Sequence, residues 1–190
     1  MKFEGERPEP RTTQQQLGFR FASSDNKHVI QAALGGLVFS RLPPYEEWSL
    51  LRDEAKRVWK VYADHMRPEN ITRVATRYVN KLELPGPHVN FDDYLNYIPK
   101  VPKALPQLLA GFFSQIVVPD PQSDCTAIVT HMYRPSQKGS EVTVILDIDV
   151  FRERLVTAED DIWSTLEQLR NFKNLIFFDS ITEECVRLYL

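Results

Sequence analysis

Two acidic residues on one predicted strand are the sharpest candidate for chemistry in this sequence. Asp147 and Asp149 lie two positions apart in the alternating segment 141–151, so a strand points both carboxylates to the same face. Such a pair is able to bind a divalent cation, as in metal-dependent nucleases and nucleotidyl transferases. The sequence lacks the glycine-rich phosphate turn of a nucleotidyl transferase, and it has no third acid with a lysine at nuclease spacing.

The competing interpretation of the acid pair is structural. Arg73, Arg77 and Lys81 share one face of the strand predicted at 71–84. A neighbouring strand of this kind would bring basic side chains within hydrogen-bond distance of the two carboxylates. We therefore predict that the pair accepts hydrogen bonds from basic side chains and holds no metal ion.

A group of polar residues on the same strand is a weaker candidate for ligand binding. Arg77, Tyr78 and Asn80 have side chains that often recognise polar ligands. Strand alternation points Arg77 away from Tyr78 and Asn80, so the three side chains cannot all face one pocket. Tyr78 and Asn80 are expected to form hydrogen bonds inside the core.

No other catalytic constellation is complete in the sequence. The four histidines lack the i, i+4 spacing of a helical metal site, and the two cysteines are single. A Walker loop, Gly-x-Gly-x-x-Gly, Gly-x-Ser-x-Gly and His-Glu-x-x-His are all missing. The sequence does not exclude a Cys/His nucleophile pair, because the two residues of such a pair need to be close only in the folded structure. We predict no catalytic residue and no cofactor. The residues concerned are His28, His65, His88, His131, Cys125 and Cys185.

Composition indicates a globular protein in a reducing compartment. Of 190 residues, 43% are hydrophobic and 26% are charged, which is enough apolar material for a core. No segment approaches the ~20 apolar residues of a membrane span, and the first ten residues lack the apolar core of a secretory signal. Two cysteines cannot form a disulfide framework, so we expect a cytoplasmic protein. The net charge of −3 disfavours a general nucleic-acid or anionic-membrane binder.

Hydrophobic periodicity predicts an α+β fold in which two long amphipathic helices pack against antiparallel sheet. One long helix follows Tyr45 and ends at Pro68, and a second covers 157–178 with Lys173 on its apolar stripe. Short helices are expected at 91–95 and after Ser180. Strands are expected at 17–21, 28–34, 37–41, 71–84, 111–118, 125–133 and 141–151.

The predicted elements divide the chain into four segments. A polar arm at 1–16 precedes a first block of three strands, one helix and a long strand at 17–84. A short helix and a proline-rich connector occupy 85–110, and a second block with a C-terminal short helix occupies 111–190. Because both blocks contain three strands followed by a helix, we predict a tandem duplication of a strand, short helix, three strands and long helix.

A family resemblance rests on four segments, namely SRLPPYEEW at 40–48, RYVNKLELP at 77–85, LDIDVF at 146–151 and LRNFKNLIFFDSITE at 169–183. In this order they resemble a sporadically distributed family of uncharacterised bacterial proteins. The family segments read Arg-Leu-x-Pro-Tyr-x-x-Trp, Arg-Tyr-x-Asn-Arg-Ile-x-Leu-Pro, Leu-Asp-Ile-Asp and Phe-Phe-x-Ser-Ile-Thr-Glu. Lys81 stands where the family has arginine. The resemblance covers about residues 17–190 and implies an architecture, but it assigns no catalytic residue.

The resemblance also implies that family members begin with another strand and helix, which this sequence lacks. A sheet without that strand is expected to keep an unpaired edge among the strands at 17–41. Phe19, Phe21 and Phe39 are then expected to be partly bare. We therefore predict a homodimer or a protein partner that binds through 17–41. The alternative is that the arm at 1–16 folds back and covers this edge.

Together these features predict a non-enzymatic ligand- or partner-binding module of the α+β class in the bacterial cytoplasm. The alternative is a metal-dependent enzyme that acts on nucleotides or nucleic acid through Asp147 and Asp149. A divalent cation within coordination distance of both carboxylates would favour the enzyme, whereas pairing of both carboxylates with arginine would favour the binding module.

Overall fold

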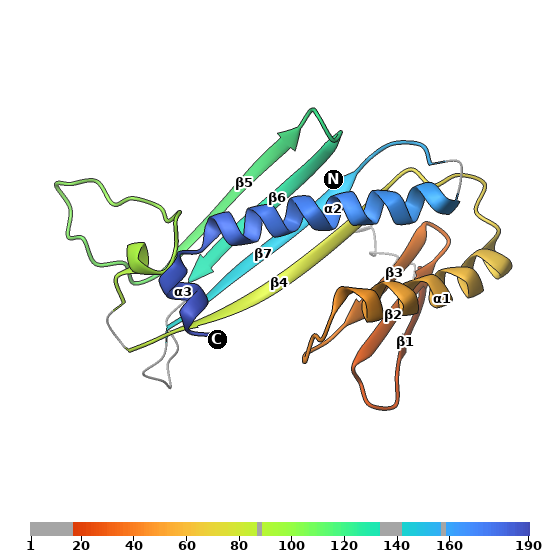
Figure 1. Cartoon of the computed structure of the whole chain (residues 1–190), viewed down its shortest axis with the longest axis horizontal. Coiled ribbons are helices and arrows are strands. Elements are labelled where there is room, and N and C mark those ends of the chain that lie inside the picture. The colour runs from red at the N-terminus through yellow and green to blue at the C-terminus, as the bar shows by residue number, and fades with distance from the viewer. Residues whose placement is uncertain (1–16, 87–88, 134–141, 157–158) are drawn as a thin grey trace, which may run out of the picture. The chain divides into compact units, whose positions relative to one another are not determined.

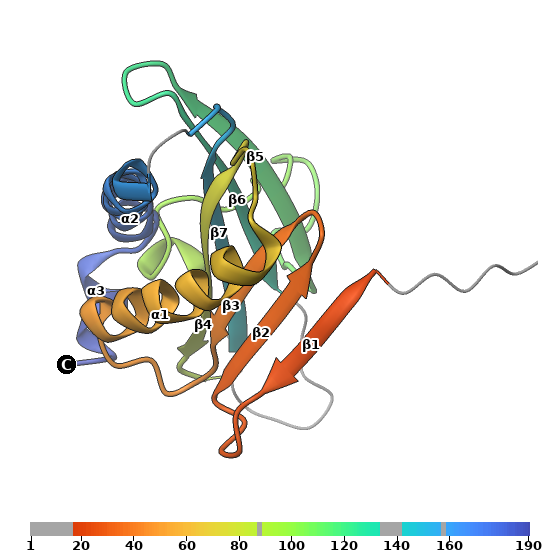
Figure 2. The same cartoon turned by 90° about the vertical axis from the view of Figure 1, so that its right-hand side faces the viewer.

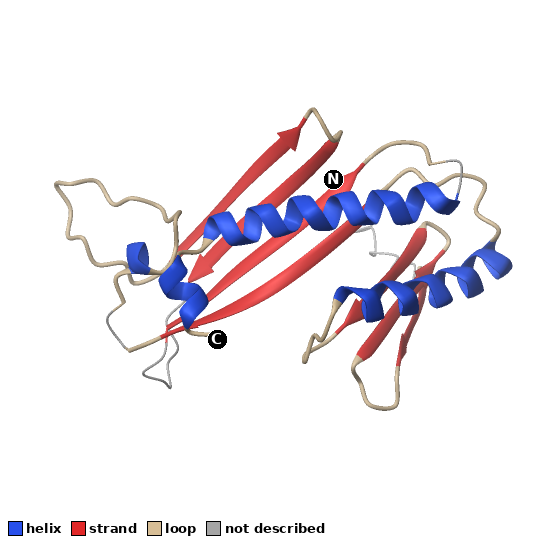
Figure 3. Ribbon diagram, viewed as in Figure 1, coloured by secondary structure: helices blue, strands red, loops and turns tan. Residues whose placement is uncertain are grey.

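The computed structural model describes residues 17–86, 89–133, 142–156 and 159–190. The chain divides into two units, with the boundary between Glu69 and Asn70. Each unit combines antiparallel strands with a long helix (Figure 1 and Figure 3). The α+β class predicted from the sequence is therefore confirmed. The arm predicted at 1–16 lies outside the described residues.

The first unit is an antiparallel three-stranded sheet followed by a helix. β1 (Gly18–Ala22), β2 (His28–Ala33) and β3 (Gly36–Arg41) lie side by side in that order (Figure 2), and α1 (Trp48–Met66) comes next in the chain. All three strands and the helix lie within a few residues of their predicted positions, since short turns and prolines separate them in the sequence.

Local contacts explain the turns and packing of this unit. Asp25 accepts a hydrogen bond from the Lys27 N–H at 3.0 Å, and this Asx turn connects β1 to β2. Val58 and Tyr62 are the buried residues of α1. The Tyr62 hydroxyl donates a hydrogen bond to the Ala33 carbonyl at 2.8 Å, which fastens the helix to the end of β2.

The second unit contains a four-stranded antiparallel sheet in the order β4-β7-β6-β5. Its strands are β4 (Val74–Leu84), β5 (Phe112–Asp120), β6 (Cys125–Tyr133) and β7 (Val142–Arg152). The segment 71–84 is predicted as part of the first block, but the corresponding strand β4 pairs with β7 along its whole length. Both strands have 11 residues with matching alternation, which explains this pairing.

The core of the second unit lies on one face of this sheet. β7 and β6 bury every second side chain, as their alternating sequences predict. α2 (Glu159–Ser180) packs on this face against β4 and β7, and Figure 2 shows it on one side of the sheet. The fully or almost fully buried residues of β7 are Val142, Val144, Leu146, Ile148 and Val150.

Residues 89–110 of the connector and the C-terminal helix cover the remaining core. The 3₁₀ helix η1 (Phe91–Asp93) places the Phe91 ring 5.0 Å from the Tyr133 ring, measured between centroids. α3 (Glu183–Arg187) begins after Thr182, whose side chain accepts a hydrogen bond from the Cys185 N–H. The N-cap is therefore Thr182, because Ser180 still belongs to α2.

The two units contain elements in a similar order. β1-β2-β3-α1 and β5-β6-β7-α2 have the same sequence of antiparallel strands and helix. Their dimensions differ, since β1 to β3 have five or six residues and β5 to β7 have nine to eleven. Trp48 is the first residue of α1, whereas Trp163 is the fifth of α2. Duplication stays a prediction.

Candidate functional site

The acid pair on β7 is bound to arginines of β4. The Arg77 guanidinium makes a two-pronged contact with Asp147, in which Nε donates to Oδ1 at 2.8 Å and Nη2 donates to Oδ2. Arg73 Nη2 lies 3.4 Å from Asp149 Oδ2, which is a weaker contact. The Asp147 carboxylate raises the pKa of Arg77 above its usual value. The sequence-based prediction of arginine pairing is thereby confirmed for both acids.

Register explains which cation reaches which acid. Asp149 lies directly opposite Arg77, and Asp147 lies opposite Val79, so Arg77 reaches its acid diagonally. Lys81, the third predicted donor, instead forms an ion pair with Glu83 on its own strand. A metal ion shared by both acids would have to displace two guanidinium groups. This geometry therefore favours a structural role for the pair.

We expect Mg²⁺ or Mn²⁺ to leave the melting temperature unchanged. An ion that binds the folded chain at a hundredfold excess over its Kd would stabilise it by about 2.7 kcal/mol. Thermal unfolding with and without the ion, for the natural chain and for Asp147→Asn, measures this effect. A rise in melting temperature that disappears in Asp147→Asn would establish a metal site and favour the enzyme.

Tyr78 and Asn80 lie on the opposite face of β4 from Arg77, as alternation predicted. Asn80 Nδ2 donates to the Leu146 carbonyl at 3.0 Å. Lys173 of α2 places its Nζ 4.0 Å from the centre of the Tyr78 ring, in a cation–π contact. The three residues proposed as a ligand set therefore do not meet: Tyr78 contacts α2 through Lys173, and Asn80 bonds to β7 within the sheet.

Lys173 has an environment that the sequence did not reveal. Burial, followed by the nearby charge of Arg170, lowers the pKa of Lys173 to about 8. The relevant sequence feature was a lysine on an otherwise apolar helical stripe, which indicates a cation facing the sheet. Its contact with Tyr78 supports a packing role at the interface between α2 and β4.

His131 is a second residue whose environment the sequence did not reveal. It lies on the core face of β6 and is only 1% exposed, and neither ring nitrogen has a hydrogen-bond partner among the described residues. The Tyr97 ring lies 5.7 Å away between centroids, and the Tyr97 hydroxyl contacts Ser114 at 3.3 Å. Burial lowers the pKa of His131 below its usual value.

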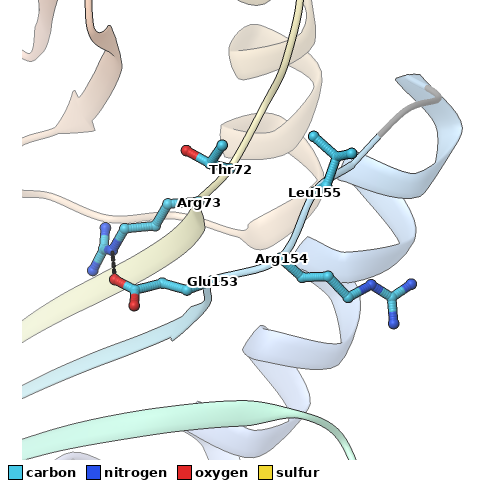
Figure 4. Close-up of a pocket in the computed structure, with 5 residues that line it drawn as sticks. All are labelled: Thr72, Arg73, Glu153, Arg154 and Leu155. Atoms are coloured by element: carbon cyan, nitrogen blue, oxygen red, sulfur yellow. Dashed lines mark ion pairs between the residues drawn. The ribbon is translucent and has the colours of Figure 1, made fainter.

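A surface hollow of about 420 Å³ lies at the ends of β4 and β7. Figure 4 shows its five lining residues, Thr72, Arg73, Glu153, Arg154 and Leu155. Arg73 pairs with Glu153 at 3.6 Å, and the guanidinium of Arg154 points away from that pair. The hollow therefore lacks a set of converging polar groups for a ligand.

A second hollow of about 440 Å³ is formed by the connector and the ends of β6 and β7. Phe91, Leu108 and Tyr133 contribute apolar surface to it. Lys100 and Asp92, which also line it, form an ion pair at 2.7 Å. Because its charged groups are paired with each other, this hollow offers a ligand no free charge from these two residues.

Comparisons with protein families, curated proteins and solved structures give no match. In the part of the chain that the structure describes, no three His, Cys, Asp or Glu side chains gather closely enough to hold a metal ion. None of its described helices is both long and apolar enough to cross a membrane.

The strongest exposed feature of the second unit is the outer strand of its sheet. Among the strands that the structure describes, β5 pairs with β6 alone. Apolar side chains are exposed on both of its faces, namely Phe113 (64%), Ile116 (39%), Val117 (61%) and Val118 (36%). We call these four residues the β5 edge surface. The sequence predicts this strand but not its exposure, because exposure depends on the order of strands in the sheet.

Proposed function

We propose that this chain is a non-enzymatic, cytoplasmic protein-binding module that takes an extended segment of a protein partner as an additional strand beside β5. The observation that supports this function is the β5 edge surface. An edge strand presents backbone N–H and C=O groups that an added strand can pair with. Exposed apolar side chains on both faces give that strand something to pack against.

The sequence of β5 differs from that of a protected edge. Proteins guard sheet edges with charged side chains, prolines, short strands or bulges. β5 has nine residues, and its first charged residue is Asp120 at the very end. Pro119 protects only the last part of the strand. Within the described part of the chain, residues 112–118 therefore carry none of these protections.

The opposite edge of the same sheet is guarded. β4 carries Arg77, Lys81 and Glu83 along the strand. Its exposed valine, Val79, is surrounded by these charges in the sequence. An apolar partner strand would have to approach these charged side chains. The two edges of this sheet therefore differ in charge, and we assign binding to β5.

The strands at 17–41 were expected to carry the partner surface, and this expectation remains a prediction. β1 is exposed along its length, and the Phe19 and Phe21 side chains are 62% and 54% exposed. However, β1 has only five residues, with Arg20 at its centre. On β3, Val38 alone among the large apolar side chains is more than a third exposed. We therefore assign the partner strand to β5.

Two free, buried cysteines support a reducing compartment. Cys125 and Cys185 are both enclosed in the second unit, and burial raises the pKa of the Cys185 thiol. A raised thiol pKa lowers the fraction of reactive thiolate. Packing is therefore the role that the structure supports for Cys185.

The proposed function is tested with a peptide that copies the strand. The probe is a fluorescent synthetic peptide of residues 112–120 with lysines added at both ends for solubility. Fluorescence polarisation should show saturable binding to the natural chain. Val117→Lys should weaken binding at least tenfold, or about 1.4 kcal/mol, because a lysine on an edge strand opposes the addition of an apolar strand.

Val79→Lys is the matched control. Val79 and Val117 are 62% and 61% exposed and lie on opposite edges of one sheet. The control variant should bind the peptide as the natural chain does. Equal binding by the natural chain and Val117→Lys, or loss of binding only in Val79→Lys, would refute the assignment to β5.

A further inference from the structure

We infer that the partner strand is β5 of a second copy of this chain, so that two four-stranded sheets join into one continuous sheet about a two-fold axis. This inference rests on the proposed function of β5 and names its partner. Closed two-fold assembly is the commonest form of homo-oligomer, and it requires a surface that is complementary to itself. β5 meets that requirement in charge and in side-chain pattern.

Charged residues oppose the pairing of a strand with its own copy. Any charged residue near the two-fold axis meets the same charge on the copy, which is destabilising. Residues 112–119 of β5 contain no Lys, Arg, Asp or Glu. Self-pairing of β1 would bring two copies of Arg20 together near its centre. β5 is therefore suited to a second copy.

The register follows from the side-chain pattern. A two-fold axis at Gln115 places Phe113 opposite Val117 of the copy and Phe112 opposite Val118, with each pair on one face of the sheet. Aromatic and β-branched residues are favourable cross-strand pairs. This register also leaves Pro119, which has no N–H donor, at the end of the paired segment.

The expected affinity is modest. Paired segments of seven residues form a contact smaller than a standard stable interface. We expect a dimer Kd on the order of micromolar. Sedimentation velocity of the full chain over a concentration series around that value should show a monomer–dimer equilibrium. Val117→Lys should raise the dimer Kd at least tenfold, and Val79→Lys should leave it unchanged.

Cysteine cross-linking tests the register itself. In Gln115→Cys the new thiol faces its own copy across the axis, at a Cα separation of roughly 4.5–5.5 Å that a disulfide can span. Mild oxidation should then give a covalent dimer. In Val117→Cys the two thiols lie four residue steps apart, or about 13 Å, so no covalent dimer should form. The native cysteines are buried.

The outcomes separate this inference from the proposed function. If the natural chain stays monomeric well above micromolar concentration, the partner strand is not β5 of a second copy. Peptide binding by that monomer would leave the proposed function standing. A dimer that survives Val117→Lys, or that is cross-linked by Val117→Cys and not by Gln115→Cys, would overturn both the surface and the register.

Discussion

Replacing Leu169 with alanine is expected to lower the free energy of unfolding of the second unit by about 3 kcal/mol. Leu169 has no exposed surface and lies in the middle of α2, the helix that packs against β4 and β7. The substitution removes buried methyl groups and leaves a cavity between rigid elements. Urea denaturation followed by circular dichroism measures the change.

Leu175→Ala is the control for this prediction. It makes the same substitution in the same helix, at a residue whose side chain is 65% exposed. Its effect should stay within about 0.5 kcal/mol, as for ordinary surface changes. Similar losses at Leu169 and Leu175 would contradict the orientation of α2, since they would place both leucines in comparable surroundings.

His131→Leu is expected to raise the free energy of unfolding by about 1–3 kcal/mol at pH 7. The imidazole is buried, and its two ring nitrogens have no partner in the described part of the chain. Burying an unpaired polar group carries a cost of that size, and leucine of similar volume removes it. A loss of stability in His131→Leu would contradict this prediction, because it would mean that the imidazole forms stabilising hydrogen bonds in the folded chain.

The pH dependence of stability provides a second readout for His131. Burial lowers the pKa of His131 in the folded chain below the 6.5 of an exposed histidine. Between those two values the unfolded chain binds a proton that the folded chain does not, so stability falls as the pH falls below about 6.5. The slope contributed by this group is at most about 1.4 kcal/mol per pH unit.

His131→Leu should remove this contribution. Chemical denaturation at several pH values between 7 and 5 compares the natural chain with the variant. The difference in stability between the two should widen as the pH is lowered through 6.5. A difference that is constant over this range would show that His131 titrates alike in the folded and unfolded chains.

Local patterns in the sequence were sufficient for most elements of the fold. The strand predicted at 141–151 is β7 (Val142–Arg152), because five consecutive even-numbered apolar residues leave one choice of buried face. Alternation also separated Arg77 from Tyr78 and Asn80 correctly. The arginine pairing of Asp147 followed from charge and alternation once β4 was taken as a neighbour of β7.

Features that depend on contacts distant in the sequence could not be read in this way. The order β4-β7-β6-β5 decides that β5 is an edge strand, and no local pattern fixes that order. The burial of the His131 ring depends on Tyr97 and on the neighbouring strands. Lys173 gave a local indication, but its contact with Tyr78 requires α2 to cross β4.

Amide hydrogen exchange along β5 is the most direct test of strand addition at this edge, because it reports on the backbone groups that an added strand would pair with. Alternate amides of residues 112–118, those not bonded to β6, should exchange more slowly as the protein concentration is raised through the micromolar range. Amides of β4 should keep their rates. If the exchange rates of the β5 amides do not change with protein concentration, and do not change with saturating peptide of residues 112–120, no strand is added beside β5.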